Sequence, residues 1–284
     1  MEREDQKIPG AVGRTHRATA RAVRVIISSL KKGGRLFFVG AGTSGRLGVL
    51  EAAECPPTFN TPPGLVQAVI AGGKRSVFRS KEGAEDRGGE ARHEIGKRVK
   101  KGDVVVGISA SGVTNFVREA LKRAKKQGAK TILVACNLSS PLRSLADVTI
   151  APRTGPEVIA GSTRLKAATA TKLILNRLTV AAMVRLGKVY ENWMVDLQPR
   201  SKKLRARGIG ILKHFAGLSD ENAEKIFKKA GGRVKAAILM ARKNWTYKQA
   251  QRALKKADGF LRRALRHPEG RRPEGSRDPS LRSG

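Results

Sequence analysis

Short apolar runs alternate with longer amphipathic segments through the first half of the chain. The runs are rich in Val, Ile and Leu and predict β-strands at residues 36–40, 65–71, 103–110, 131–137 and 148–152. Strands that alternate with helices form right-handed βαβ units, which gives a parallel sheet covered on both faces. The pattern therefore predicts an α/β fold, a three-layer α/β/α doubly wound sheet of five parallel strands in the flavodoxin-like order 2-1-3-4-5.

Three segments have clear helical periodicity. Residues 11–34 end in Lys-Lys-Gly-Gly, a helix stop, and their apolar stripe contains Ala18, Ala22, Val25 and Ile26. Residues 113–130 predict a second helix, which ends at a glycine. Residues 162–186 are rich in Ala and Leu and contain no Pro, so they predict one long helix with Ser162 or Thr163 as its N-cap.

The composition changes near residue 200. Residues 200–284 contain 24 Lys and Arg against 7 Asp and Glu. Three short helices are predicted there, at residues 219–230, 234–243 and 246–257, with breaks at the glycines of 231–232 and 258–259. The last residues are rich in Pro, Gly and Arg, so we expect disorder. The predicted division is a sugar-phosphate-binding catalytic domain at 1–198, a small helical domain at 199–266 and a basic tail at 267–284.

The whole chain has 58 Lys and Arg against 23 acids, a formal charge of +35. Such a surface attracts polyanions, so we expect nonspecific contact with nucleic acid at low salt. No zinc-finger or basic-zipper pattern is present, and aromatic residues are only 4%. No apolar run approaches the ~20 residues of a membrane span, and no secretory signal is visible. Cys55 and Cys136 form neither a disulfide framework nor a metal-ligand pattern. A cytoplasmic enzyme fits these properties best.

The loop after the first predicted strand, Gly42-Thr43-Ser44-Gly45, lies within a G-x-G-x-x-G pattern. A dinucleotide site would also need an acidic residue ~20 residues later, for the ribose hydroxyl. Neither residues 57–64, at that distance, nor the end of the second strand supplies one. The loop is therefore interpreted as an anion site at a helix start.

A second loop of the same kind follows the third strand, at Ser109-Ala110-Ser111-Gly112. In the 2-1-3-4-5 order, strands one and three are neighbours at the switch point where ligands bind. Hydroxyl groups and backbone amides from both loops would then surround one phosphate group. Two such loops favour a small phosphorylated ligand.

Clustered carboxylates are the candidates for chemistry in this acid-poor chain. Glu51 and Glu54 share one face of the helix that follows the first loop. Cys55-Pro56-Pro57 is expected to end that helix and hold Glu54 at the rim of the site. A second cluster contains Glu82, Glu85, Asp86 and Glu90. Spacing alone does not separate these residues from an ordinary solvated face.

Four segments together are specific: FFVGAGTSGRLGVLEAAECPPTF, KEGAEDR, DVVVGISASG and GPEVIAGSTRLKA. They resemble the N-acetylmuramic acid 6-phosphate etherases, which belong to the sugar isomerase (SIS) domain superfamily. The resemblance extends over roughly residues 2–265. The ECPP and GSTRLKA segments are more specific than either Ser/Gly loop.

The resemblance implies a carbon–oxygen lyase that acts on N-acetylmuramic acid 6-phosphate in the peptidoglycan recycling of amino sugars. Elimination and then hydration give N-acetylglucosamine 6-phosphate and D-lactate, without a metal or nucleotide cofactor, in a homodimer. The matching motifs assign Glu54 as the proton donor and Glu85 as the second catalytic acid/base. The expected substrate and phosphate contacts are Gly42, Thr43, Ser44, Gly45, Ser109, Ser111, Gly112, Glu157, Ser162 and Lys166.

Two other functions stay open. Glucokinase-regulatory proteins are similar in their SIS domains and do no chemistry, so a non-catalytic sugar-phosphate-sensing regulator is the alternative. The presence of both Glu54 and Glu85 argues against it. A nucleic-acid-associated protein would use the basic C-terminal third, and its binding would persist at near-physiological salt.

Overall fold

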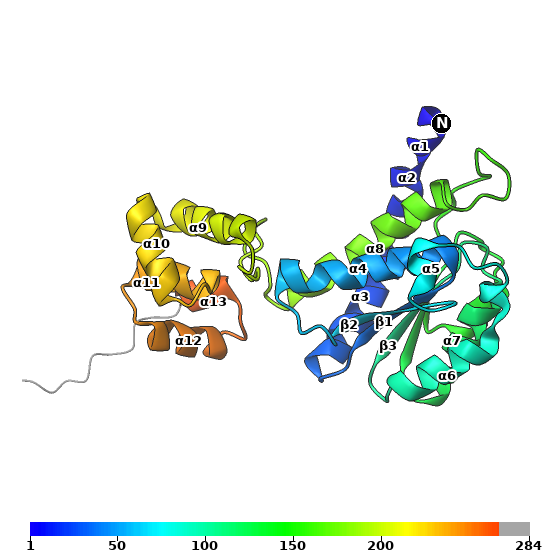
Figure 1. Ribbon diagram of the computed structural model, residues 1–284, viewed down its shortest axis with the longest axis horizontal. Coiled ribbons are helices and arrows are strands. Elements are labelled where there is room, and N and C mark those ends of the chain that lie inside the picture. The colour runs from blue at the N-terminus through cyan, green and yellow to red at the C-terminus, as the bar shows by residue number, and fades with distance from the viewer. Residues whose placement is uncertain (267–284) are drawn as a thin grey trace, which may run out of the picture.

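A five-stranded parallel sheet forms the centre of the N-terminal part of the protein (Figure 1). The computed structural model describes residues 1–266. Neighbouring strands are all parallel, in the order β2-β1-β3-β4-β5, which confirms the predicted order. The strands are β1 Leu36–Gly40, β2 Val66–Ile70, β3 Val104–Ile108, β4 Lys130–Val134 and β5 Val148–Ile150.

Helices cover both faces of the sheet, so the predicted three layers are confirmed. Leu36 and Phe38 of β1 pack into one core with helices from the N-terminus and the middle of the chain. Phe37 and Val39 point to the opposite face and pack into a second core. This alternation follows from the two-residue period of a strand. The first face is covered by α2 Lys7–Gly13, α3 His16–Lys31, α4 Gly42–Phe59 and α8 Lys166–Arg185, and the second by α6 Gly88–Arg98 and α7 Asn115–Lys126.

Four short elements complete this part: α1 Glu2–Asp5, α5 Arg75–Phe78, and the 3-10 turns η1 Ala84–Asp86 and η2 Pro141–Leu145. The helix predicted over residues 11–34 is divided between α2 and α3. Within residues 1–266, no helix has the length and hydropathy that crossing a membrane requires.

The prediction that α4 ends at Glu54 was wrong. The helix continues through Pro56 and Pro57 to Phe59. Each proline removes one backbone hydrogen bond, but both lie in the last turns, where little helix remains to be disrupted. Asn60 then ends the helix in left-handed backbone with φ of 52°, and its N–H donates to the Pro56 carbonyl at 2.9 Å.

The predicted N-cap of the long helix was also wrong. α8 begins at Lys166, and neither Ser162 nor Thr163 caps it. The Glu157 carboxylate instead accepts the backbone N–H groups of Lys166 and Ala167, each at 2.9 Å. A carboxylate from the preceding loop thus satisfies the free donors of the helix start and complements its positive end.

The C-terminal helices form a separate group, shown beside the α/β part in Figure 1. They are α9 Lys202–Ala216, α10 Asp220–Lys229, α11 Val234–Lys243, α12 Tyr247–Lys256 and α13 Leu261–Arg266. A core of their own contains Ile211, Phe227, Leu239 and Leu261. The three predicted helices are present, whereas α9 and α13 were missed. The division at residue 198 stays a prediction, and the expected disorder of 267–284 lies outside the described residues.

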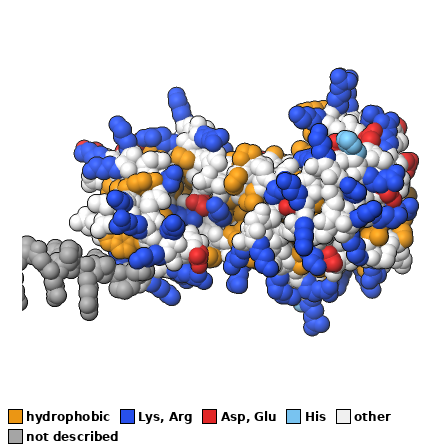
Figure 2. Space-filling model, turned by 90° about the horizontal axis from the view of Figure 1, so that it is seen from below, with side chains coloured by type: hydrophobic (Ala, Val, Ile, Leu, Met, Phe, Trp, Pro, Cys, Tyr) orange, Lys and Arg blue, Asp and Glu red, His pale blue; other side chains and the backbone are white. Residues whose placement is uncertain are grey.

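Basic side chains are spread over the surface. Figure 2 shows Lys and Arg over both the α/β part and the helical group, with few acidic side chains among them. No single stripe gathers them on the face in that view. A general basic surface therefore describes this face better than a dedicated nucleic-acid groove does.

The contact between α4 and β1 can be tested with Gly45→Ala. A Cβ at Gly45 would lie 2.6 Å from the Gly40 carbonyl oxygen and from an Ile70 side-chain carbon, so backbone must move. We expect the free energy of unfolding, measured by circular dichroism in urea, to fall by about 1–3 kcal/mol. Gly10→Ala is the control, because Gly10 is exposed within α2 and its Cβ would meet nothing closer than 3.8 Å. Unchanged stability of Gly45→Ala would contradict this account of the contact.

Candidate active site

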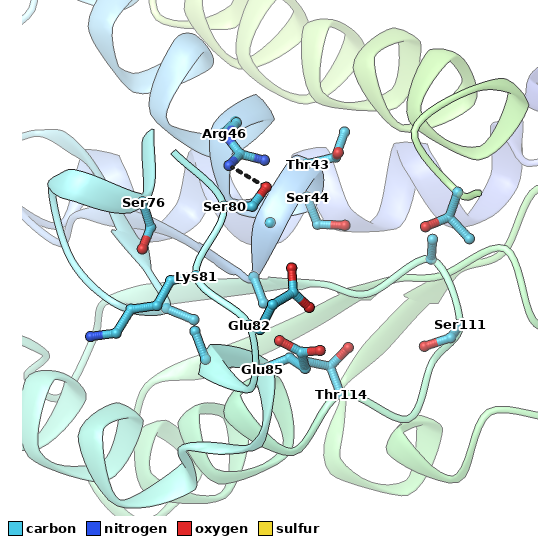
Figure 3. A pocket seen from close by; sticks show the side chains of 16 residues that line it. Thr43, Ser44, Arg46, Ser76, Ser80, Lys81, Glu82, Glu85, Ser111 and Thr114 are labelled. Carbon is cyan, nitrogen blue, oxygen red and sulfur yellow. Dashed lines mark hydrogen bonds between the residues drawn. The ribbon is translucent and has the colours of Figure 1, made fainter. Parts of the chain in front are cut away.

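A cavity of about 340 Å³ lies at the carboxyl ends of β1 and β3 (Figure 3). These ends are level in the sheet, because Gly40 pairs with Ile108. Segments from four parts of the chain meet there, as expected at the switch point of a doubly wound sheet. The polar side chains that line the cavity are those of Thr43, Ser44, Arg46, Ser76, Ser80, Lys81, Glu82, Glu85, Ser111, Thr114 and Thr163.

The first loop supplies the start of α4. Gly42 has φ of +51° and begins the helix, with Ala41 as an N-cap that makes no side-chain hydrogen bond. The backbone N–H groups of Thr43 and Ser44 belong to the first turn, which has no intrahelical acceptor for them. With the helix dipole and two hydroxyl groups, this turn can bind an anion. Gly45 does not line the cavity; it allows the close approach of α4 to β1.

Ser109 stabilises the second loop, and nearby residues of the chain line the cavity. Ser109 is buried, and its Oγ accepts the Gly112 N–H at 3.0 Å and lies 2.8 Å from Thr114 Oγ1. Gly112 has φ of +73°, and a Cβ there would lie 2.4 Å from Ser140. These two residues therefore shape the loop, while Ser111 and Thr114 line the cavity. Sequence reasoning had not named Thr114.

Two carboxylates line the cavity, those of Glu82 and Glu85. Figure 3 shows the Glu85 carboxylate beside Thr114, with the Glu82 carboxylate between that pair and Ser44 in this view. Within residues 1–266, neither forms an ion pair, although the chain is strongly basic. Of their predicted cluster, Glu90 lies outside the cavity and accepts from Arg87 at 3.0 Å. Asp86 also lies outside it.

Two cationic side chains that were not predicted from the sequence also line the cavity. Arg46 lies one turn into α4, and its guanidinium donates to the Val77 carbonyl at 2.9 Å and to Ser80 Oγ at 3.4 Å. These bonds connect the segment after β2 to the phosphate loop. Lys81 is the second cation. Arg46 could have been predicted as a lining residue, because it directly follows the first loop. No sequence pattern indicated Ser76, Ser80 or Lys81.

Glu54 lies outside this cavity. It is exposed on α4, ten residues after Ser44, which places it ~15 Å further along the helix. Glu51, one turn earlier, is buried; it pairs with Lys172 at 2.9 Å and accepts from the Thr179 hydroxyl. Glu51 therefore connects α4 to α8, and Glu54 is exposed outside the cavity lining.

Glu157, Ser162 and Lys166 do not line the cavity, whereas Thr163 of the same loop does. Lys166 is 1% exposed, and its Nζ forms an ion pair with Glu4 at 2.5 Å. The pKa of Glu4 is lowered to about 2, mainly by the hydrogen bond from Lys166 and next by the hydrogen bond from Lys7. Within residues 1–266, no three His, Cys, Asp or Glu side chains gather as they would around a metal ion.

Two family models match overlapping parts of the chain, the glucokinase regulatory protein N-terminal SIS domain at residues 18–125 and the SIS domain at residues 86–181. A Geobacillus thermodenitrificans protein named N-acetylmuramic acid 6-phosphate etherase is 46% identical over 266 residues, 93% of this chain and 90% of that protein. A protein of the same name from Symbiobacterium thermophilum is 50% identical over 239 residues, 84% of this chain and 80% of that protein. This chain belongs to the N-acetylmuramic acid 6-phosphate etherase family.

Solved structures agree with the fold of this etherase-family member. A phosphoheptose isomerase from Francisella tularensis matches with a TM-score of 0.50 at 17% identity, and the match covers 63% of this chain and 94% of that one. At that identity the likeness concerns the fold alone. The resemblance to the etherases and the SIS fold are therefore confirmed.

The cysteines of this etherase-family chain are predicted to be unreactive. Burial raises the pKa of Cys55 to about 12, and the charges of Glu51 and Glu54 add to this effect. Burial raises the pKa of Cys136 to about 11, although a hydrogen bond with Thr154 opposes it. At pH 8 less than about one thiol in a thousand is then ionised. Iodoacetamide should label the native protein far more slowly than the urea-unfolded protein, and equal labelling rates would contradict the burial of these thiols.

Proposed function

We propose that this chain cleaves the D-lactyl ether of N-acetylmuramic acid 6-phosphate to give N-acetylglucosamine 6-phosphate and D-lactate. The proposal is supported by relatives of that name at 46% and 50% identity over most of both chains. The observation that supports it most directly is the presence of both hydroxyl loops and Glu85 around one cavity. The reaction would serve the recycling of cell-wall amino sugars in the cytoplasm.

The phosphate group would bind at the first turn of α4. Thr43 and Ser44 offer hydroxyls and free N–H groups, and Ser111 approaches from the second loop. The guanidinium of Arg46 adds positive charge near this turn, and Lys81 lines the cavity from the segment after β2. Gly42, Gly45, Ser109 and Gly112 would act indirectly, because they set the backbone of the two loops.

The chemistry requires a base and an acid. In the open-chain sugar, the aldehyde acidifies the proton on C2. Glu85 would remove that proton, the electron pair would form the C2–C3 double bond, and the C3–O bond would break. The leaving lactate oxygen would take a proton from Glu54. Water then adds, with its hydroxyl on C3 and a proton returned to C2. Each acid or base typically contributes ~10²–10⁴-fold.

Glu54 would come from a second subunit. It is exposed ~15 Å along α4 from the first turn of that helix, and it does not line the cavity of its own chain. A symmetric homodimer could bring the α4 helix of one subunit to the cavity of the other. Glu157, Ser162 and Lys166 would support the site through their loop rather than touch the phosphate.

A regulator that binds sugar phosphates without turnover is the second candidate. The match of residues 18–125 to the glucokinase regulatory protein SIS domain favours sugar-phosphate binding in either case. The unpaired carboxylates of Glu82 and Glu85 in the cavity favour catalysis. Tight binding of N-acetylmuramic acid 6-phosphate without release of lactate would support the regulator.

The reaction is tested by lactate release in water labelled with ¹⁸O. Elimination followed by hydration should place the label on the sugar product and leave lactate unlabelled. Glu85→Gln should lower kcat by about 10²–10⁴-fold. Glu90→Gln is the matched control, because Glu90 lies five residues after Glu85, outside the cavity lining, and pairs with Arg87. Near-normal turnover of Glu85→Gln would remove Glu85 from the chemistry.

The shared site is tested by mixing subunits. Glu54→Gln and Glu85→Gln homodimers should each be inactive. Reassociation of an equal mixture makes half of the dimers mixed, and each mixed dimer has one site with both carboxylates, so about a quarter of the wild-type activity should return. Each variant reassociated with itself is the control. No recovery on mixing would contradict a site built from Glu54 of one subunit and Glu85 of the other.

A further inference from the structure

The Lys166 side chain is placed where its charge is costly. It is 1% exposed, and it occupies the first position of α8, where the helix dipole disfavours a cation. Burying a charged group is unfavourable unless it is paired and hydrogen-bonded. A lysine at such a position needs a compensating carboxylate, and the neighbouring residues supply two.

Glu157 and Glu4 compensate this end of the helix in different ways. Glu157 accepts the backbone N–H groups of Lys166 and Ala167 at 2.9 Å each. Glu4 accepts from the Lys166 ammonium itself, although 162 residues separate the two along the chain. The lowered pKa of Glu4 agrees with this contact. The start of α8 is therefore held by one carboxylate from its own loop and one from the N-terminal helix.

The N-terminal helices lie against α8, which brings Glu4 to this position (Figure 1). The guanidinium of Arg177 in α8 donates to the Val12 carbonyl of α2 at 3.1 Å, a second connection between the two. Glu4 also pairs with Lys7, but Lys7 is exposed and on the next helix along the chain. The Lys166 contact thus joins α1 to the start of α8.

The loop between β5 and α8, residues 151–165, runs from this ion pair to the cavity. Gly155 of the loop has φ of +69°, and a Cβ there would lie 3.8 Å from Lys166 Nζ. Glu157 anchors the loop's middle on the helix start, and Thr163 lines the cavity beside the two hydroxyl loops. The loop therefore folds around Lys166 while its residue Thr163 lines the cavity.

We propose that Glu4 and Lys166 are positioning residues, whose ion pair, buried on the Lys166 side, holds loop 151–165 so that Thr163 faces the bound sugar phosphate. The inference rests on the proposed function for its ligand. The pair acts through the loop and touches no reacting atom, so its loss should weaken substrate binding more than it slows the chemical step. We expect KM to rise about tenfold with kcat within about threefold of wild type.

The test compares Glu4→Gln with Lys7→Gln. Each variant removes one charge of the Glu4–Lys7 pair, but only Glu4→Gln breaks the contact with Lys166. Hydrogen–deuterium exchange should rise in peptides covering residues 151–165 of Glu4→Gln and stay at the wild-type level in Lys7→Gln and in α9–α13. Calorimetric titration with N-acetylglucosamine 6-phosphate should give about tenfold weaker binding for Glu4→Gln alone.

Other outcomes are equally informative. Unchanged exchange in residues 151–165 of Glu4→Gln would overturn the proposal, and so would an equal rise in every peptide, which would indicate a general loss of stability. The double variant Lys166→Met with Glu4→Gln removes both charges and keeps a buried side chain at position 166. Recovery of the wild-type exchange and affinity in this double variant would also overturn the proposal. A wild-type protein that binds the sugar phosphate without releasing lactate would contradict the etherase function and leave these readouts intact.

Discussion

The cavity depends on a close contact between the end of β1 and the first turn of α4. This contact leaves no room for a side chain. A Cβ at Gly40 would lie 2.8 Å from the Gly45 nitrogen, and a Cβ at Gly45 would lie 2.6 Å from the Gly40 oxygen. The two glycines let α4 start directly on the sheet. α4 then runs over one face, while α7, which follows β3, runs over the other. The space left where the two connections diverge is the cavity, and free backbone donors of α4 form one of its walls.

Several carboxylates of the α/β part stabilise its fold by accepting hydrogen bonds and forming ion pairs. Asp103 is buried, accepts the backbone N–H groups of Arg35 and Lys100 at 2.8 Å each, and pairs with the Arg35 guanidinium at 2.7 Å. Glu51 joins α4 to α8 in the same manner, and Glu157 closes the start of α8. Glu82 and Glu85 have no such structural contact: within residues 1–266 neither forms an ion pair, and both line the cavity.

Local patterns in the sequence were enough for the sheet and for the two hydroxyl loops. The strand order followed from βαβ connectivity, and α11 was predicted to the residue. The errors arose where distant contacts or unusual local chemistry decide. α4 continues through two prolines, and α9 was missed because Gly208 and Gly210 interrupt its pattern; Gly208 is needed where Phe227 packs within 2.9 Å of its Cβ position. The partner of Lys166 lies 162 residues away, so no window of sequence could reveal it.

The separate core of the C-terminal helices has a practical consequence for spectroscopy. Both tryptophans of the chain, Trp193 and Trp245, pack against that core, and the two cores of the sheet contain none. Trp193 stacks near His214 with ring centres 4.8 Å apart. Intrinsic fluorescence excited at the red edge of tryptophan absorption therefore reports on the helical group alone, and the sheet with its cavity is optically silent in that measurement.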